Sequence, residues 1–359
     1  MDYLKKLKEI IDSAVQSKAS DVHIVVGHPP VFRIGGALVP QPKYGIVSEQ
    51  EAVNLANSVM NPEKQAQFLN EKEVDFAYHF SDKYRLRANI FRQMGFVSCA
   101  FRLISAKIKT IEELHLPLVI KKFTTAEQGL VLITGASSQG KSTTLASLID
   151  TINHTRREHI ITIEDPIEFI FQDDLSLVEQ REMHEDTLSF NKALRSALRE
   201  DPDVIMVGEM RDLETISTTI TAAETGHLVF ATLHTNSANQ TIHRIIDVFP
   251  GRQQNQIRSQ LASSLLGIVT QRLIPVNHCS FLPACEIMFN NSAIANLIRE
   301  NKIHEIPSVI ETSSREGMRT LNKSLLEMIQ DGTISQETAL LYSLNPEDLK
   351  IRLQDYQKK

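Results

Sequence analysis

The chain has 359 residues, of which 42% are hydrophobic and 23% charged, so it is long enough for two domains with apolar cores. Its formal net charge of −6 and its lack of tryptophan argue against a nucleic-acid-binding surface as the main function. No apolar run reaches the length of a membrane span, and the first residues lack the apolar core of a secretory signal. We therefore expect a cytoplasmic protein.

The three cysteines, Cys99, Cys279 and Cys285, are scattered through the chain and form no Cys-x-x-Cys pair. This spacing indicates neither a disulfide framework nor a zinc site. We expect all three to be ordinary buried thiols.

Residues 1–107 are predicted to form a small α+β domain. Apolar residues at helical spacing from Leu4 to Ala14 indicate an amphipathic helix, which Ser20 and Asp21 are expected to end. A second helix is expected over residues 49–69. Strands are expected over residues 22–26, 31–38, 74–80, 84–91 and 96–104, the second of them as a hairpin around Gly35 and Gly36.

Arginines alternate with apolar residues in two of these strands. The alternation places Arg85 and Arg87 on the face opposite Leu86, and it places Arg102 opposite Phe101. Most exposed arginines are simply solvated. Arginines on paired strands can instead present a triphosphate-binding surface to another subunit.

A phosphate-binding loop is the strongest motif in the chain. After an expected linker at 108–128, the β-prone run 131–134 leads into Gly-x-x-x-x-Gly-Lys-Ser, and a helix is expected to follow. In such a loop the backbone N–H groups and the helix N-terminus bind a triphosphate, a lysine reaches the β- and γ-phosphates, and a serine hydroxyl binds Mg²⁺. The residues expected to bind ATP are Gly135, Ala136, Ser137, Ser138, Gln139, Gly140, Lys141, Ser142 and Thr143.

Two later strands end in glutamates. Strands expected over 159–163, 204–207 and 227–234 alternate with helices, which indicates a largely parallel sheet. Glu164 and Glu209 follow the first two, at the edge where such sheets bind ligands. Singly, each glutamate is as readily a helix cap or a surface turn. Beside a phosphate loop, however, a Mg²⁺–nucleotide site needs one carboxylate for the hydrated metal and one to activate water, and the sequence leaves open which is which.

Two histidines flank the last of these strands. His227 and His234 are seven residues apart, which is not the spacing of zinc ligands. A lone histidine is usually structural, but their placement suits sensing of the γ-phosphate. From about Gln253 onward we expect mainly helix, because Leu261, Leu265, Ile268 and Val269 recur at helical spacing.

The order of several longer motifs resembles the type II/IV secretion ATPase superfamily, and within it the retraction ATPases of type IV pili. These motifs lie at residues 18–23, 163–168, 180–182, 193–203, 207–212, 225–235 and 294–300, so the resemblance covers essentially the whole chain. It implies a PAS-like α+β N-terminal domain (1–107) and an α/β RecA-like ATPase domain (129–359) with a helical C-terminal part. It also implies a homohexamer with ATP at the junction of domains and subunits.

The same resemblance implies roles for individual residues. Glu164 falls in the Asp box, Glu209 is the Walker B glutamate, and His227 and His234 form the His box. Arg87 and Arg102 match arginines of the N-terminal domain that approach the nucleotide. Turnover would drive pilus retraction and twitching motility through a platform protein, at the cytoplasmic face of the inner membrane.

Two positions depart from the family pattern. The family loop usually reads Gly-Pro-Thr-Gly-Ser-Gly-Lys-Ser-Thr, so Ser138 replaces a glycine here. If that position has positive φ, we expect strain of about 1 kcal/mol and weaker ATP binding. Ala295 stands where retraction ATPases usually carry arginine. We expect this change to affect the coupling of ATP hydrolysis to retraction and not hydrolysis itself.

Other functions remain open at this stage. An assembly or secretion ATPase commonly carries a tetracysteine zinc module, which three scattered cysteines cannot supply. An accessory retraction ATPase, acting beside a principal motor, fits the same motifs. The altered loop also fits a nucleotide-binding regulator with little turnover, although both candidate catalytic glutamates are retained. A nucleic-acid translocase is the weakest alternative, since the chain lacks an interleaved basic and aromatic groove.

Overall fold

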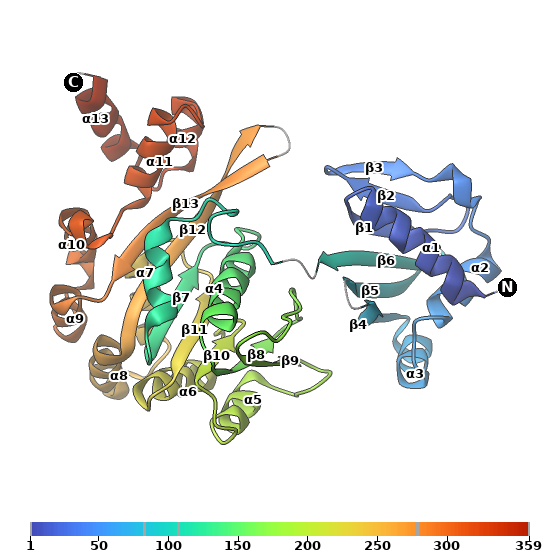
Figure 1. Ribbon diagram of the computed structural model, residues 1–359, viewed down its shortest axis with the longest axis horizontal. Helices are drawn as coiled ribbons and strands as arrows, with labels where there is room; N and C mark the ends of the chain where they lie inside the picture. The colour runs from blue at the N-terminus through green and yellow to red at the C-terminus, as the bar shows by residue number, and fades with distance from the viewer. Residues whose placement is uncertain (1, 82–83, 106–107, 278–279, 358–359) are drawn as a thin grey trace. The chain divides into compact units, whose positions relative to one another are not determined.

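The computed structural model describes residues 2–81, 84–105, 108–277 and 280–357. The chain divides into two units, Met1–Lys107 and Ile108–Lys359 (Figure 1). Residues 108–128, which the sequence suggests as a linker, belong to the second unit. Four of their apolar side chains are buried in its core: Ile111, Leu116, Ile120 and Phe123.

The first unit contains a six-stranded antiparallel sheet in the order β3-β2-β1-β6-β5-β4. Its strands are β1 (Ala19–Ile24), β2 (Val31–Ile34), β3 (Ala37–Pro40), β4 (Glu73–Ser81), β5 (Tyr84–Gln93) and β6 (Phe96–Ser105). Its helices are α1 (Tyr3–Gln16), η1 (Pro42–Tyr44), α2 (Glu49–Asn57) and α3 (Pro62–Glu71). Side chains of α1, α2, α3 and the sheet share one apolar core, so this unit is the expected α+β domain.

Two boundaries in this unit differ from the prediction. The single helix expected over 49–69 is two helices, because Pro62 cannot continue a helix and Asn61 caps the second one instead. Ser20 and Asp21 do not end the first helix but lie in β1. That helix ends at Gln16, and Lys18 then adopts a positive φ of 54°.

The predicted division of the sheet into an apolar and an arginine-bearing face is confirmed. Leu86 and Phe101 are fully buried, whereas Arg87 and Arg102 are exposed and stand directly opposite each other on β5 and β6. Arg102 donates from Nε to Asp21 Oδ1 at 3.1 Å. Like charges placed opposite each other are unfavourable in a sheet, and here Asp21 offsets the charge of Arg102.

The second unit contains a seven-stranded sheet in the order β13-β12-β7-β11-β10-β8-β9, which is parallel except for β13. Its strands are β7 (Gly129–Thr134), β8 (His159–Glu164), β9 (Leu177–Glu182), β10 (Val204–Val207), β11 (Leu228–Leu233), β12 (Leu265–Asn277) and β13 (Ser280–Phe289). The apolar runs that predicted β7, β8, β10 and β11 are buried on both faces, as parallel strands require.

Helices cover both faces of this sheet. On β7, Leu130 and Leu132 face one apolar cluster, whereas Val131 and Ile133 face another that includes α4 and η2. The helices are η2 (Leu118–Thr125), α4 (Lys141–Thr155), α5 (Phe190–Ala197), α6 (Leu213–Glu224), α7 (Ala238–Asp247), α8 (Gly251–Ser264), α9 (Ser292–Arg299), η3 (Ile303–Glu305), α10 (Ile306–Thr312), η4 (Ser314–Glu316), α11 (Leu321–Gln330), α12 (Gln336–Tyr342) and α13 (Pro346–Gln357). This is the predicted α/β fold. None of the helices in the described ranges is long and apolar enough to cross a membrane.

The expectation of mainly helix after Gln253 is wrong for two long strands. Helix α8 ends at Ser264, and Leu265, Ile268 and Val269 lie in β12, which pairs with β7 and β13. The spacing of these residues fits a helix, but a short apolar run buried on both faces gives no periodic signal that separates helix from strand.

Cys99 and Cys285 are buried thiols, as expected, and burial raises the pKa of each to about 12. Cys279 lies outside the described residues.

Truncation of Phe230, which is fully buried on β11, should lower the free energy of unfolding by about 3–5 kcal/mol because it removes apolar contacts and leaves a cavity. Phe230→Ala and Phe281→Ala can be compared by urea unfolding, since Phe281 is 58% exposed. Equal losses in the two variants would contradict the described core.

Candidate functional site

The loop between β7 and α4 has the geometry of a phosphate-binding loop. Gly140 has a positive φ of 77° and caps α4, whose first helical residue is Lys141. Gly135 also has positive φ, and a Cβ there would lie only 2.4 Å from the Gln271 carbonyl oxygen. The backbone therefore favours glycine at both positions. The first N–H groups of a helix have no partner within the helix, so the N-terminus of α4 can bind an anion at this loop.

A cavity of about 240 Å³ opens at this loop. It lies at the carboxyl ends of β7, β8, β10 and β11, where a parallel sheet binds ligands. The candidate residues that line it are Ser137, Ser138, Lys141, Ser142, Glu164, Glu209 and His234. The structure thus brings together residues that the sequence spreads over nearly one hundred positions.

A chain of polar contacts crosses this cavity from Lys141. Lys141 Nζ donates to the carbonyl oxygens of Gly135 and Ala136, both at 2.9 Å, and lies 3.3 Å from His234 Nδ1. His234 Nε2 is 3.2 Å from Glu209 Oε1. An ammonium needs an acceptor, so Nδ1 carries no proton in this arrangement and Nε2–H donates to the carboxylate. Burial lowers the pKa of Lys141, although Glu209 and Glu168 act in the opposite direction.

At the other end of this series of polar contacts, Glu209 is kept ionised. Glu209 Oε2 also accepts from Arg211 Nη2 at 2.8 Å. Partial burial acts to raise the pKa of Glu209, but the hydrogen bonds from Arg211 and His234 and the charge of Arg211 outweigh it, so the pKa lies below its usual value. Glu209 is consequently a carboxylate at neutral pH.

Glu164 has the opposite environment, because its side chain is buried. Burial raises the pKa of Glu164 to about 7, against hydrogen bonds from Thr162 Oγ1 at 2.7 Å and Gln180 Nε2 at 3.1 Å. Two carboxyl groups in one cavity thus differ in protonation near neutral pH. Such a difference separates a proton acceptor from a permanent anion.

A second cavity, of about 360 Å³, lies on the other side of the phosphate loop. The residues that line it include Gly140 and Thr143 at the phosphate loop and the apolar side chains of Leu116, Leu273 and Phe281. An apolar cavity next to a phosphate-binding helix N-terminus suits an aromatic base.

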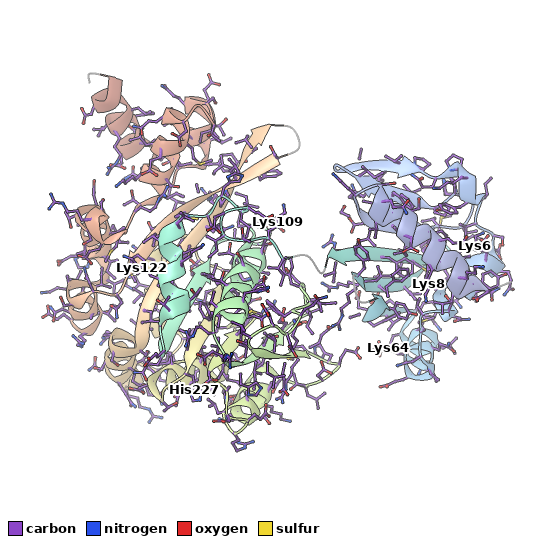
Figure 2. All side chains as sticks on the ribbon, in the orientation of Figure 1. Lys6, Lys8, Lys64, Lys109, Lys122 and His227 are labelled. Atoms are coloured by element: carbon purple, nitrogen blue, oxygen red, sulfur yellow. The ribbon has the colours of Figure 1, made fainter. Side chains whose placement is uncertain are left out.

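The two histidines are separated by the structure. His234 follows β11 and lies in the cavity, whereas His227 precedes the same strand, which places it roughly 20 Å away at the opposite edge of the sheet. In Figure 2 His227 lies in the lower part of this unit, well apart from Lys109, which lines the second cavity. His227 Nδ1 instead contacts the Ala222 carbonyl oxygen at 2.9 Å. Of these two histidines, His234 alone lines the cavity at the phosphate loop of its own chain.

The family model described as "Type II/IV secretion system protein" matches residues 3–325. The chain belongs to this family. It is 44% identical to the "Type IV pilus retractation ATPase PilT" of Pseudomonas aeruginosa over 95% of this chain and 99% of that protein. It is 37% identical to the "Type IV pilus ATPase PilU" of the same organism, over 97% of this chain and 91% of PilU. A crystal structure of "the Pilus Retraction Motor PilT and Bound ADP" superposes with a TM-score of 0.90 at 45% identity, covering 96% of this chain and 98% of that one.

The structure shows the backbone conformation and the contacts of Ser138 and Gln139, two of the residues at which the loop departs from the family pattern. Ser138, which replaces a glycine, has a positive φ of 62°. The condition for strain is therefore met. Gln139 does not line the phosphate cavity, and its side-chain oxygen accepts from Leu273 N in β12 at 2.7 Å. Ala295, the other departure, lies in α9 and packs into the apolar core with an exposed fraction of 7%.

Several site residues were missed in the sequence. Arg211 lies in the motif at residues 207–212, but its ion pair with Glu209 depends on a turn that residue spacing does not reveal. Gln180 likewise reaches Glu164 from a strand, β9, that the sequence analysis did not predict. Gln271 lies in the β12 segment interpreted as helix, although its side chain contacts Gln139 and Thr144. Gln271 stands between Thr270 and Arg272 in the sequence, so its residue type alone gave no signal that its side chain is buried and hydrogen-bonded.

Ser138→Gly should relieve the positive-φ strain of roughly 1 kcal/mol, an amount that the greater unfolded-state freedom of glycine partly offsets. Ser137→Gly is the matched control, because Ser137 does not have a positive φ and only the entropic loss applies. We expect the free energy of unfolding of Ser138→Gly to exceed that of Ser137→Gly by about 1 kcal/mol in urea titrations. If the two glycine variants were equally stable, Ser138 would not be strained.

Glu164 should make the stability depend on pH. Its pKa is raised in the folded state from 4.5 to about 7, so between these values the folded state holds a proton that the unfolded state has lost, and stability falls as pH rises. Burial raises the pKa of Glu286 in the same way, and it also raises the pKa of Asp150 and of Glu158, so the wild type keeps a decline from these groups when Glu164 is replaced. Glu164→Gln should therefore show a shallower decline in free energy of unfolding from pH 4.5 to 7 than wild type.

Urea unfolding at a series of pH values measures this decline. Glu305→Gln serves as the control, because Glu305 is exposed and has no place in the cavity. A pH profile for Glu164→Gln that parallels both the control and wild type would rule out a raised pKa at Glu164.

Proposed function

We propose that the chain is an ATP-hydrolysing motor that, as a homohexamer, powers retraction of type IV pili and hence twitching motility. The chain is an ATPase that binds ATP and ADP. The observation that carries this proposal is the convergence of Lys141, Glu164, Glu209 and His234 on one cavity at the phosphate loop. The similarity to the retraction ATPase over nearly the full length of both proteins connects that chemistry to pili.

The triphosphate would lie in the cavity, with its charge on the loop N–H groups and on Lys141. To reach it, Lys141 exchanges its bonds to the Gly135 and Ala136 carbonyl oxygens for phosphate oxygens. The ATP-binding residues remain those of the loop, from Gly135 to Thr143. The second cavity, beside Gly140 and Thr143, is suited to the adenine base.

The donor set fits a nucleotide-bound Mg²⁺. Ser142 offers a hydroxyl and Glu209 an ionised carboxylate at the same cavity, and hard oxygen donors are what Mg²⁺ takes. Among the described residues there is no cluster of three acidic, histidine or cysteine side chains that would hold a metal alone. This agrees with an ion held partly by phosphates, which would neutralise charge that develops on the transferred phosphoryl group.

The two glutamates have different roles in this proposal. Glu164, with a pKa of about 7, accepts the proton of the attacking water. Glu209 remains ionised and orients the metal side of the site. His234 lies between Glu209 and Lys141, so it is the side chain placed to respond to the γ-phosphate.

In the homohexamer we propose, Arg87 and Arg102 of the N-terminal domain supply positive charge to the nucleotide, since both stand exposed on one face of their sheet. His227, at the far edge of the sheet from the loop of its own chain, would then act only toward a neighbouring subunit. The motor would be a cytoplasmic protein at the inner face of the inner membrane, acting on the pilus platform protein, with no nucleic acid partner.

One alternative rests on the altered loop. An accessory motor like PilU, working beside a principal retraction ATPase, or a nucleotide-binding regulator with little turnover would tolerate the strain at Ser138. The lower identity to PilU, 37% against 44% to PilT, favours the principal motor.

Steady-state Mg²⁺-dependent ATPase activity tests the proposal. Glu164→Gln should lower kcat about 10²–10⁴-fold, because it removes the base, while an ATP analogue still binds. Lys141→Ala should lose both binding and turnover, and Glu209→Gln should lose turnover. Glu305→Gln, at an exposed glutamate outside the cavity, should match wild type. If wild type binds ATP but hydrolyses it no faster than Glu164→Gln, the isolated chain is a regulator or depends on a partner ATPase.

A further inference from the structure

Strand β12 continues beyond the end of β7, the strand with which it pairs in parallel. Its last register partner on β7 is Thr134, opposite Thr270, but β12 runs on to Asn277. The backbone N–H of Leu273 faces the side where β7 has ended, and it donates to Gln139 Oε1 at 2.7 Å. Pro275, the next residue on that side, has no N–H to satisfy. One side chain of the phosphate loop therefore takes the place of a missing strand partner.

Gln271 makes a second connection between the same two segments. Its side chain is 4% exposed, donates from Nε2 to the Gln139 carbonyl oxygen at 2.8 Å, and accepts from Thr144 Oγ1 at 2.6 Å. The main chain and the side chain of Gln139 are thus both tied to β12. The serine usual at this position of the family loop is two atoms too short to make the bond to Leu273.

The opposite face of β12 contacts the C-terminal helices. Arg272 donates to the Tyr342 carbonyl oxygen at the end of α12. Ile274 is fully buried in a cluster with Leu325 of α11 and Leu349 of α13. Figure 1 shows α11, α12 and α13 together beside the ends of β12 and β13 that lie away from α8. Alternate residues of β12, from Gln271 to Ile274, therefore contact the phosphate loop and the helices in turn.

We propose that Gln139 is a positioning residue that fastens the phosphate loop to β12 and, through Arg272 and Ile274, to helices α11–α13. The inference rests on the proposed nucleotide binding by this loop. Gln139 is half-buried and lies outside the phosphate cavity, so it acts on the loop and not on the phosphates. A loop held in its binding shape binds more tightly than one that must first be ordered.

Gln139→Met tests the link, since methionine has a similar length but no oxygen. Losing one hydrogen bond should raise the Kd for a fluorescent ADP analogue and the KM for ATP about three- to tenfold, while kcat changes less than about twofold. Gln254→Met is the matched control: Gln254 is half-buried on α8 and donates to the Phe249 carbonyl oxygen at 3.1 Å. It should leave KM unchanged. Hydrogen exchange at the Leu273 amide should accelerate in Gln139→Met alone.

Arg272→Met tests the continuation to the helices. It should raise the Kd for the ADP analogue about two- to fivefold in wild type but have little further effect in Gln139→Met, because the link is already broken. Effects that multiply would show that the helices do not act through Gln139. Wild-type affinity and wild-type Leu273 exchange in Gln139→Met would overturn the inference while leaving the ATPase intact. A wild type that binds no nucleotide would overturn the proposed function, and the inference with it.

Discussion

The parallel pairing of β7, β8, β10 and β11 is the constraint on which the rest of the site depends. The carboxyl ends of parallel strands lie at the same edge of the sheet. Residues that follow different strands therefore lie close together there, although they are far apart in sequence. Glu164 is the last residue of β8, and Lys141, Glu209 and His234 follow β7, β10 and β11. The buried apolar runs that form the strands therefore determine the catalytic geometry as well as the core.

Burial and charge then give similar side chains different properties. Glu164 and Glu209 have the same chemistry, but one is desolvated beside neutral donors and the other accepts from Arg211. The order of the two pKa values follows from these surroundings. It resolves, as a proposal, which of the two glutamates accepts a proton, a question that sequence left open.

Local patterns predicted much of the fold. The phosphate loop, the four parallel strands and the hairpin at Gly35 and Gly36 were recognisable, because each depends on residues close together in sequence. Features that depend on long-range pairing were missed. The run at Leu265 is a strand only because β7 and β13 lie on either side of it, and His227 is remote from the loop only because β11 has a direction. The hydrophobic pattern of a segment predicts many of the helices and strands, but it does not predict which strands pair with one another.

The alternation along β12 limits how the second unit can deform. A strand whose successive side chains are committed to opposite faces cannot slip by one residue, because every contact on both faces would be exchanged for its opposite. It also stretches little, being almost fully extended. A shift of β12 along β7 would therefore have to break or carry with it the contacts on both faces, those with the phosphate loop through Gln139 and those with the C-terminal helices through Arg272.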